Sequence, residues 1–273
     1  MSTPAFKTEK VSDRITRIYA FSTELMYLVE GEDRAALLDT GTGIGSLRAV
    51  VESLTDKPLI VLLTHGHIDH AMGAPEFPAE SVYINHEDKY IYDRHKSLEF
   101  RADGLAMMGP AGEAVTEADY IPPAEIESFR DLKEGDRFDL GGVSVEIYAC
   151  PGHTRGSVVM LIPEERTVLL GDACNSFTFL FEDYSSSVEE YRESLIRLRG
   201  LLEGKYNTAL SSHGDGVLAP GVIDENIALC ARILAREDDA APFAFKGSSG
   251  VIALAAGEPT HGNIVYDPAR LTR

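Results

Sequence analysis

One short segment constrains this chain more than any other, because three histidines and one aspartate fall within six residues: His65, His67, Asp69 and His70. The segment directly follows residues 59–63, whose continuous apolar run predicts a buried strand. Imidazole and carboxylate groups suit borderline divalent metals such as Zn²⁺. A tight loop lets the side chains at i and i+2 converge on one ion and leaves those at i+4 and i+5 to face a second. We therefore predict a metal centre at the end of this strand.

Three further candidate ligands lie farther along the chain, each directly after a short apolar run that predicts a strand: His153, Asp172 and His213. Strands of a sandwich can deliver such residues to one edge of their sheets. Glycines beside each candidate permit turns and close backbone approach. We expect the three residues to join the first four at a common site.

The apolar pattern predicts strands and helices in two successive halves. Strand patterns occupy residues 15–21, 25–29, 35–39, 59–63, 81–85, 138–140, 143–150, 158–162, 167–170 and 208–211, with short terminal strands over 243–265. Helical spacing of apolar residues predicts helices over 44–54, 188–202 and 222–235. Ser187 and Glu190 form a capping-box pattern at the start of the second helix. This order predicts sheets covered by helices on the outside.

The chain is predicted to form a single domain, residues 1–273, because no Pro/Gly/Ser-rich linker and no repeat divides it. Residues 86–140 differ from the rest, with apolar and aromatic residues at helical spacing and several Gly and Pro breaks. We predict a mostly helical insertion there that covers the active site.

The charge balance narrows the class of partner. The chain has 25 Lys and Arg against 44 Asp and Glu, a formal net charge of −19, which disfavours nucleic acid and anionic membrane surfaces. We expect a small-molecule partner and leave a homodimer open. The N-terminal residues hold no apolar run of signal-peptide length. The cysteines Cys150, Cys174 and Cys230 cannot all pair and lack metal-type spacing, so free thiols in a reducing cytoplasm are predicted.

With these residues in place, the chain resembles the metallo-β-lactamase superfamily of metal-dependent hydrolases, on a lactonase or glyoxalase II-like branch. The resemblance runs from about residue 11 to residue 219 and rests on the motif at 65–70, the three later ligands and the turn at 38–41. It implies an α/β (α+β) fold: a four-layer αββα sandwich of two mixed β-sheets back to back, with outer helices. Asp39 in that turn is expected to support the site rather than to react.

The resemblance also implies two divalent ions, zinc first, with iron or manganese as alternatives. One ion would bind His65, His67 and His153. The second would bind Asp69, His70 and His213, with Asp172 shared between both. A bridging hydroxide would attack the substrate, and Asp69 would orient it or shuttle the proton.

Departures from the family patterns narrow the reaction. The best-known zinc β-lactamases use a cysteine in the second site, whereas Cys174 here lies two residues after Asp172. Flavodiiron-like relatives carry a glutamate where this chain has His67, and the basic tail of glyoxalase II-like members is not evident. Hydrolysis of a small ester, lactone or thioester is the leading hypothesis. The alternatives are a mononuclear iron dioxygenase acting on persulfides, a small-molecule phosphodiesterase and a non-catalytic metal-containing ligand sensor.

An aromatic segment after Asp172 has two interpretations. The alternation of Phe177, Phe179 and Phe181 suits a strand edge or core packing, or else a wall of the substrate pocket. In the second interpretation Tyr184 would donate a hydrogen bond to a substrate oxygen. Cys174 is either a small buried thiol or a reactive group near the metals.

Overall fold

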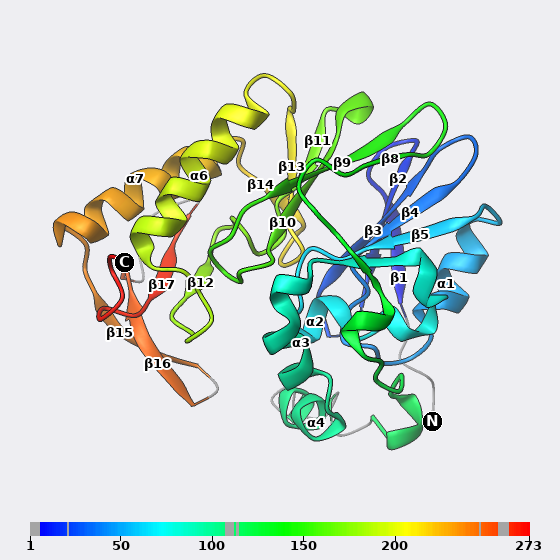
Figure 1. The fold of residues 1–273 in the computed structure, drawn as a ribbon, viewed down its shortest axis with the longest axis horizontal. Coiled ribbons are helices and arrows are strands. Elements are labelled where there is room, and N and C mark those ends of the chain that lie inside the picture. Colours follow the sequence, from blue (N-terminus) through cyan, green and yellow to red (C-terminus); the bar gives the residue numbers. More distant parts are fainter. Residues whose placement is uncertain (1–5, 21, 107–111, 113–114, 246, 256–261) are drawn as a thin grey trace.

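The computed structural model describes residues 6–20, 22–106, 112, 115–245, 247–255 and 262–273. Its main body has four layers, with two β-sheets packed face to face and helices outside each. Figure 1 shows α1 (Leu47–Leu54) on one flank, α6 (Val188–Leu202) and α7 (Val222–Ala235) on the other, and the strands between them. The predicted αββα sandwich of two mixed sheets is confirmed.

The first sheet carries the strand that precedes the histidine motif. Its seven strands, counted over the described residues, are β1 (Lys7–Lys10), β2 (Ile15–Tyr19), β3 (Leu25–Glu30), β4 (Ala35–Leu38), β5 (Leu59–Leu62), β6 (Val82–Ile84) and β7 (Arg130–Asp131), in that order. The strands from β1 to β4 pair antiparallel, whereas β4, β5, β6 and β7 pair parallel. Parallel strands end at the same edge, so residues that follow β4, β5 and β6 come together there.

The second sheet delivers the three later candidates. Over the described part of the chain it contains β14 (Val217–Leu218), β13 (Thr208–Leu210), β11 (Thr167–Leu169), β10 (Val158–Ile162), β9 (Ser144–Ala149) and β8 (Arg137–Asp139), in that order. Strands β9 and β11 both run antiparallel to β10, and β13 runs parallel to β11. The carboxyl ends of β9, β11 and β13 therefore share one edge.

Three apolar layers hold the sandwich together. The middle layer lies between the sheets and joins residues such as Tyr27 and Leu38 to Val145 and Met160. The outer layers pack α1 on the first sheet and α6 with α7 on the second. Strands β4 and β10 are buried along their whole length, which explains why their apolar runs are continuous rather than alternating.

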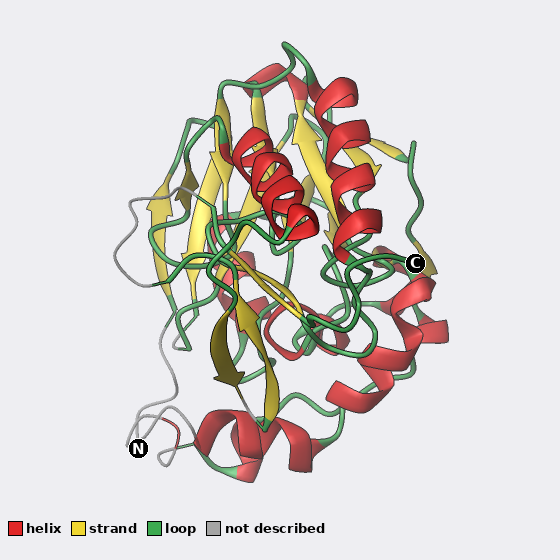
Figure 2. Cartoon of the chain, turned by 90° about the vertical axis from the view of Figure 1, so that its left-hand side faces the viewer, coloured by secondary structure: helices red, strands yellow, loops and turns green. Residues whose placement is uncertain are grey.

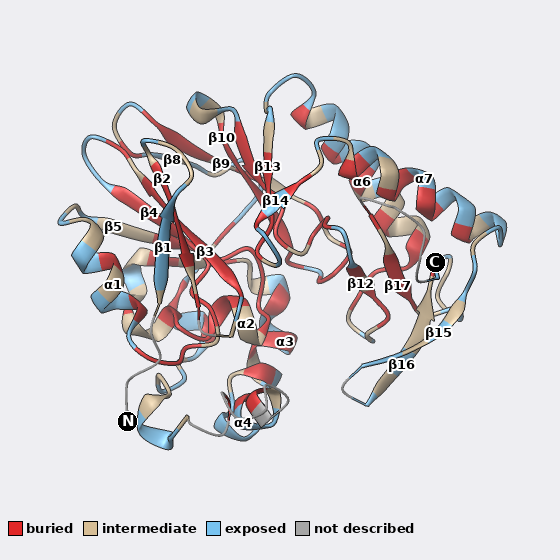
Figure 3. Cartoon of the chain, turned by 180° about the vertical axis from the view of Figure 1, so that it is seen from behind, coloured by how far each residue is buried: buried red, intermediate tan, exposed pale blue. Residues whose placement is uncertain are grey.

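Helices α6 and α7 lie side by side over the second sheet (Figure 2), with their outward faces exposed and their inward faces buried (Figure 3). The predicted capping box is present at the start of α6. Ser187 Oγ accepts the Glu190 backbone N–H at 3.2 Å, and Glu190 Oε2 accepts the Ser187 N–H at 3.0 Å. The cap predicted from residues 187–190 therefore marks the start of this helix.

The remaining helices among the described residues are short. They are the α-helices α2 (Ile68–Ala71), α3 (Lys89–His95) and α4 (Leu98–Ala106), and the 3₁₀ turns Ala74–Glu76, Ala79–Ser81, His86–Asp88, Glu117–Asp119, Ile126–Ser128 and Pro163–Glu165. Within the described ranges no helix has both the length and the apolar character needed to cross a bilayer.

Residues 86–140 are helical only in part. The segment begins with α3 and α4, and residues 107–111 and 113–114 lie outside the described residues. Its end supplies β7 to the first sheet and β8 to the second. Residues 130–131 and 137–139 therefore belong to the sheets, because an extended segment satisfies its backbone groups by pairing with a sheet edge.

A third sheet adds to the expected architecture. Its four strands in the described chain are β12 (Thr178–Leu180), β17 (Ile264–Tyr266), β16 (Ser248–Ile252) and β15 (Ala241–Phe245), in that order. The terminal strands were expected, but their pairing with β12 was not. Figure 1 shows β15 and β16 projecting from the body on the side that faces α3 and α4.

Candidate metal centre

All seven predicted ligands meet at one edge of the sandwich. His65 and His67 follow β5, and His67 is the residue that precedes the first turn of α2, which carries Asp69 and His70. The other three follow strands of the second sheet: His153 follows β9, Asp172 follows β11 and His213 follows β13. The two sheets therefore contribute from opposite sides. The residues form overlapping groups with ligand atoms within 4.8 Å of one another: His65, His67 and His153; His65, His70 and Asp172; and Asp69, His70 and His213.

The first group, His65, His67 and His153, brings three imidazole nitrogens together. His65 Nε2 and His153 Nε2 lie 2.9 Å and 2.8 Å from His67 Nδ1. His153 Nδ1–H donates to the Phe179 carbonyl oxygen at 2.8 Å, so its Nε2 presents a lone pair. His67 Nδ1 carries at most one proton and can donate it to only one of its two neighbours. The three nitrogens therefore cannot all form hydrogen bonds with one another. A cation held by their lone pairs fits this arrangement.

The second group, Asp69, His70 and His213, mixes imidazole with carboxylate. Asp69 Oδ2 lies 3.5 Å from His213 Nε2 and 3.7 Å from His70 Nε2. Asp172 Oδ2 lies 3.3 Å from His213 Nε2, 3.5 Å from His70 Nε2 and 3.7 Å from His153 Nε2. Asp172 thus stands between the two groups. His70 Nε2 is buried and has no hydrogen-bond partner among the described residues. A nitrogen whose lone pair binds a metal ion would also have no hydrogen-bond partner.

The two groups differ in their electrostatics. Burial lowers the pKa of His65 and His67 well below 6.5, so both imidazoles are neutral. Burial also disfavours the charged form of His70 and His213, but neighbouring carboxylates outweigh it. Those carboxylates raise the pKa of His70 well above 6.5 and that of His213 to about 9. The carboxylates therefore favour charged imidazoles in the second group, and a cation bound there would take the place of those protons.

Asp39 supports the second group. It follows β4 with a left-handed backbone, φ 63°, and is buried. One carboxylate oxygen accepts the Thr64 backbone N–H at 2.7 Å, and the other lies 2.8 Å from His70 Nδ1. The Thr64 hydroxyl, 2.9 Å from Asp39, lies 3.0 Å from His65 Nδ1. Asp39 therefore orients imidazoles, as buried carboxylates around metal sites do.

Asp88 is a buried carboxylate that the sequence analysis missed. Its oxygens accept the backbone N–H of Gly66 at 2.8 Å, that of Gly156 at 2.7 Å and the Thr154 hydroxyl at 2.9 Å. It thereby ties the loop of His65 to the loop of His153. Burial raises its pKa to about 6. Its one sequence signal was its place four residues after β6, a strand that ends at the same edge.

Tyr184 lies against the first group. Its hydroxyl is 2.9 Å from His67 Nε2, and its ring lies edge-on to that imidazole. Tyr184 also lines the cavity described next. Its hydrogen bond to a substrate oxygen stays a prediction.

Both groups open into one cavity of about 780 Å³, a size typical of small-molecule sites. One side is formed by α3 and α4 through residues such as Arg94, Phe100 and Leu105. The other side is formed by the aromatic segment after Asp172 and by the end of β15.

Comparison with known families agrees with this geometry. A sequence model of the metallo-beta-lactamase superfamily matches residues 21–206, more than half of the chain. This chain belongs to the metallo-beta-lactamase superfamily. Six of the seven candidate ligands lie inside the matched segment, and His213 lies just beyond it.

Three curated proteins illustrate its relatives. An uncharacterized protein of Mycobacterium leprae is 31% identical over 188 residues, 66% of this chain and 81% of that protein. The acyl-coenzyme A thioesterase MBLAC2 of Gallus gallus is 26% identical over 193 residues, 65% of this chain and 69% of that one. Hydroxyacylglutathione hydrolase GloC of Haemophilus influenzae is 26% identical over 193 residues, 67% and 84% of the two chains.

A solved superfamily structure shares the fold. The archaeal protein ST1585 from Sulfolobus tokodaii superimposes with a TM-score of 0.55 and 22% identity, covering 77% of this chain and 81% of that one.

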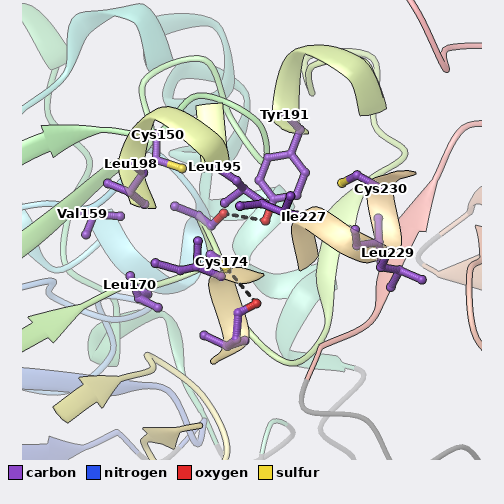
Figure 4. Close-up of a cluster of buried hydrophobic side chains, with 14 of the residues drawn as sticks. Cys150, Val159, Leu170, Cys174, Tyr191, Leu195, Leu198, Ile227, Leu229 and Cys230 are labelled. Carbon is purple, nitrogen blue, oxygen red and sulfur yellow. Dashed lines mark hydrogen bonds between the residues drawn. The ribbon is translucent and has the colours of Figure 1, made fainter. Parts of the chain in front are cut away.

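Cys174 does not occupy the position of a superfamily metal ligand. Its thiol lies in the apolar core beside Tyr191, Leu195 and Ile227 (Figure 4). The sulfur is 3.9 Å from the Val222 carbonyl oxygen, and burial raises its pKa to about 12. The thiol therefore stays protonated, and the buried, unreactive interpretation of Cys174 fits its surroundings.

Proposed function

We propose that this protein is a dinuclear metallohydrolase that cleaves small-molecule esters, lactones or thioesters. The observation that carries the proposal is the convergence of seven ligand side chains into two groups that share Asp172, at a cavity sized for a small molecule. The thioesterase and hydroxyacylglutathione hydrolase named among its relatives favour a thioester. The second group weighs against a mononuclear iron dioxygenase, which would need the first group alone.

The donor set defines what each group would hold. The three neutral imidazoles of the first group suit zinc, with iron or manganese also accepted. The second group would hold a second ion through imidazole and carboxylate, with Asp172 shared. Ions bound there would supply Lewis acidity toward the carbonyl oxygen and a water of lowered pKa.

The chain's own residues then order the proton transfers. The Asp69 side chain is partly exposed, at 32%, beside the buried His70, so it can reach both the centre and the substrate. We propose that Asp69 takes a proton from the attacking water and returns it to the leaving oxygen or sulfur. Asp39 orients the imidazole of His70, and Asp88 fixes the loops of His65 and His153. Little reorganisation is therefore needed at the moment of reaction.

The test combines metal analysis with turnover. Purified protein should contain close to two transition-metal ions per chain by mass spectrometry and should hydrolyse at least one member of a panel of thioesters, esters and lactones. Asp69→Asn should lower kcat roughly 10²- to 10⁴-fold, which is the usual contribution of a general acid–base residue to the rate. Asp224→Asn, an exposed carboxylate on α7, is the matched control. Less than one ion per chain, together with an equally active His65→Ala variant, would overturn the proposal.

A further inference from the structure

Five phenylalanines pack against one another as an aromatic surface, and four of them, all except Phe243, line one side of the cavity. We call this surface, Phe177, Phe179, Phe181, Phe243 and Phe245, the phenylalanine wall. The first three alternate along the β12 segment and so point to one face, and the other two alternate on β15. Neighbouring rings have centroids 5.2–6.0 Å apart in edge-on or tilted arrangements, as packed aromatic side chains prefer.

Two side chains of the wall are open to solvent, which is uncommon for phenylalanine. Phe177 and Phe245 are 39% and 36% exposed. Of the six large hydrophobic residues exposed in the described chain, three line this cavity: Phe177, Val217 and Phe245. An apolar surface gathered in a concave site indicates a ligand with an apolar part.

The wall begins at the metal centre. The Phe179 carbonyl oxygen accepts the N–H of His153 at 2.8 Å, so the backbone of the wall directly contacts the first group. Phe177 and Phe245 are the most exposed side chains of the wall. Across the cavity, Ile68, Phe100 and Leu105 present apolar side chains. A molecule lying on the wall would therefore have one end at the centre and an apolar chain leading away from it.

We infer that the phenylalanine wall binds the apolar acyl chain of the substrate, which makes this a hydrolase of medium- or long-chain acyl compounds. The inference rests on the proposed hydrolase function. The acyl side is assigned because the carrier thiols in the relatives' names, coenzyme A and glutathione, are polar and charged. In an acyl-coenzyme A thioester the acyl chain is the one apolar part.

The first experiment measures kcat/KM for thioesters of one thiol whose acyl chain grows from butanoyl to decanoyl. Each methylene buried on the wall should raise kcat/KM about three- to fourfold until the wall is filled. Phe177→Ser and Phe245→Ser should each lower the ratio of decanoyl to butanoyl kcat/KM about tenfold. Ile196→Ser is the control, because Ile196 is also 36% exposed but lies on α6 away from the cavity.

A second experiment separates this inference from the proposed function. Binding of 1-decanol, an uncharged chain that cannot be hydrolysed, is measured by calorimetry on the metal-loaded protein against 1-butanol. If no substrate is turned over but decanol binds and Phe245→Ser weakens it about tenfold, the hydrolase proposal fails and the apolar site stands. Turnover that is independent of acyl length, without decanol binding, overturns the inference. So does a solution dimer that Phe245→Ser dissociates, since a second copy would then cover the wall.

Discussion

The two halves of the candidate centre are built on different principles. The first group is buried, its imidazoles have lowered pKa values, and its loops are tied together by Asp88. The second group is more open, since the side chains of Asp69 and His213 are 32% and 38% exposed, and its carboxylates raise the pKa of His213 to about 9. The first group is thus ready to bind a cation, whereas the second must exchange its protons for one. We expect the first ion to be held more firmly than the second.

The largest effect on metal content and kcat/KM should come from removing one ligand from the first group or one from the second. His153→Ala should leave less than one ion per chain, whereas His213→Ala should keep about one. Both should lower kcat/KM by roughly 10³-fold, the rate equivalent of several kcal/mol of lost charge stabilisation. Metal analysis of the two variants beside Asp224→Asn checks the asymmetry. Equal metal loss in both variants would contradict it.

A smaller effect should follow from altering the support of the second group. Asp39 uses one carboxylate oxygen for the Thr64 N–H and the other for His70 Nδ1. In Asp39→Asn an amide NH₂ replaces one of these oxygens and cannot accept a hydrogen bond, so the imidazole is no longer held in one orientation. We expect the second ion to bind about 10- to 100-fold more weakly. Competition with a chelator measures both ions. Loss of the first ion alone would show that Asp39 acts mainly through Thr64 and His65.

Asp88 provides the corresponding change for the first group. Asp88→Ala leaves two backbone N–H groups and one hydroxyl without their acceptor. The first ion should bind about 10- to 100-fold more weakly, and the free energy of unfolding should fall by about 2 kcal/mol. Glu87→Gln, at the exposed neighbouring position, is the control. Unchanged metal affinity with lost stability would reduce Asp88 to a purely structural role.

The smallest effect is the pH dependence of the free energy of unfolding that results from Asp88. Burial raises its pKa from 3.8 to about 6, so the folded state favours the protonated acid. Its contribution to stability is complete below the unfolded pKa and is lost as the pH rises through 6. Between pH 5 and pH 7 the metal-free protein should lose about 1 kcal/mol relative to Asp88→Ala. Denaturant unfolding of both chains at the two pH values tests the sign, and a gain would contradict it.

Local sequence signals predicted most of the helices and strands. The helices over 188–202 and 222–235 match the structure residue for residue, because amphipathic spacing and the Ser187 cap mark their ends. The strands β2–β5, β9–β11 and β13 differ from their predicted spans by two residues at most. The signals failed at β7, which is two residues long and is a strand only because the edge of the first sheet lies beside it. Strand β8, expected over 138–140, lies one residue earlier.

The sequence by itself determined which seven residues meet, because each follows a strand and strand ends share an edge of the sandwich. Only the tertiary structure decided what surrounds them. It placed Asp88 between two histidine loops, directed Cys174 into the core, set Tyr184 against His67 and brought β15 beside the segment of Phe177. The physical reason is that residue periodicity tells which side of an element is apolar. Which distant segment covers that side is decided when the sheets pair and the layers pack.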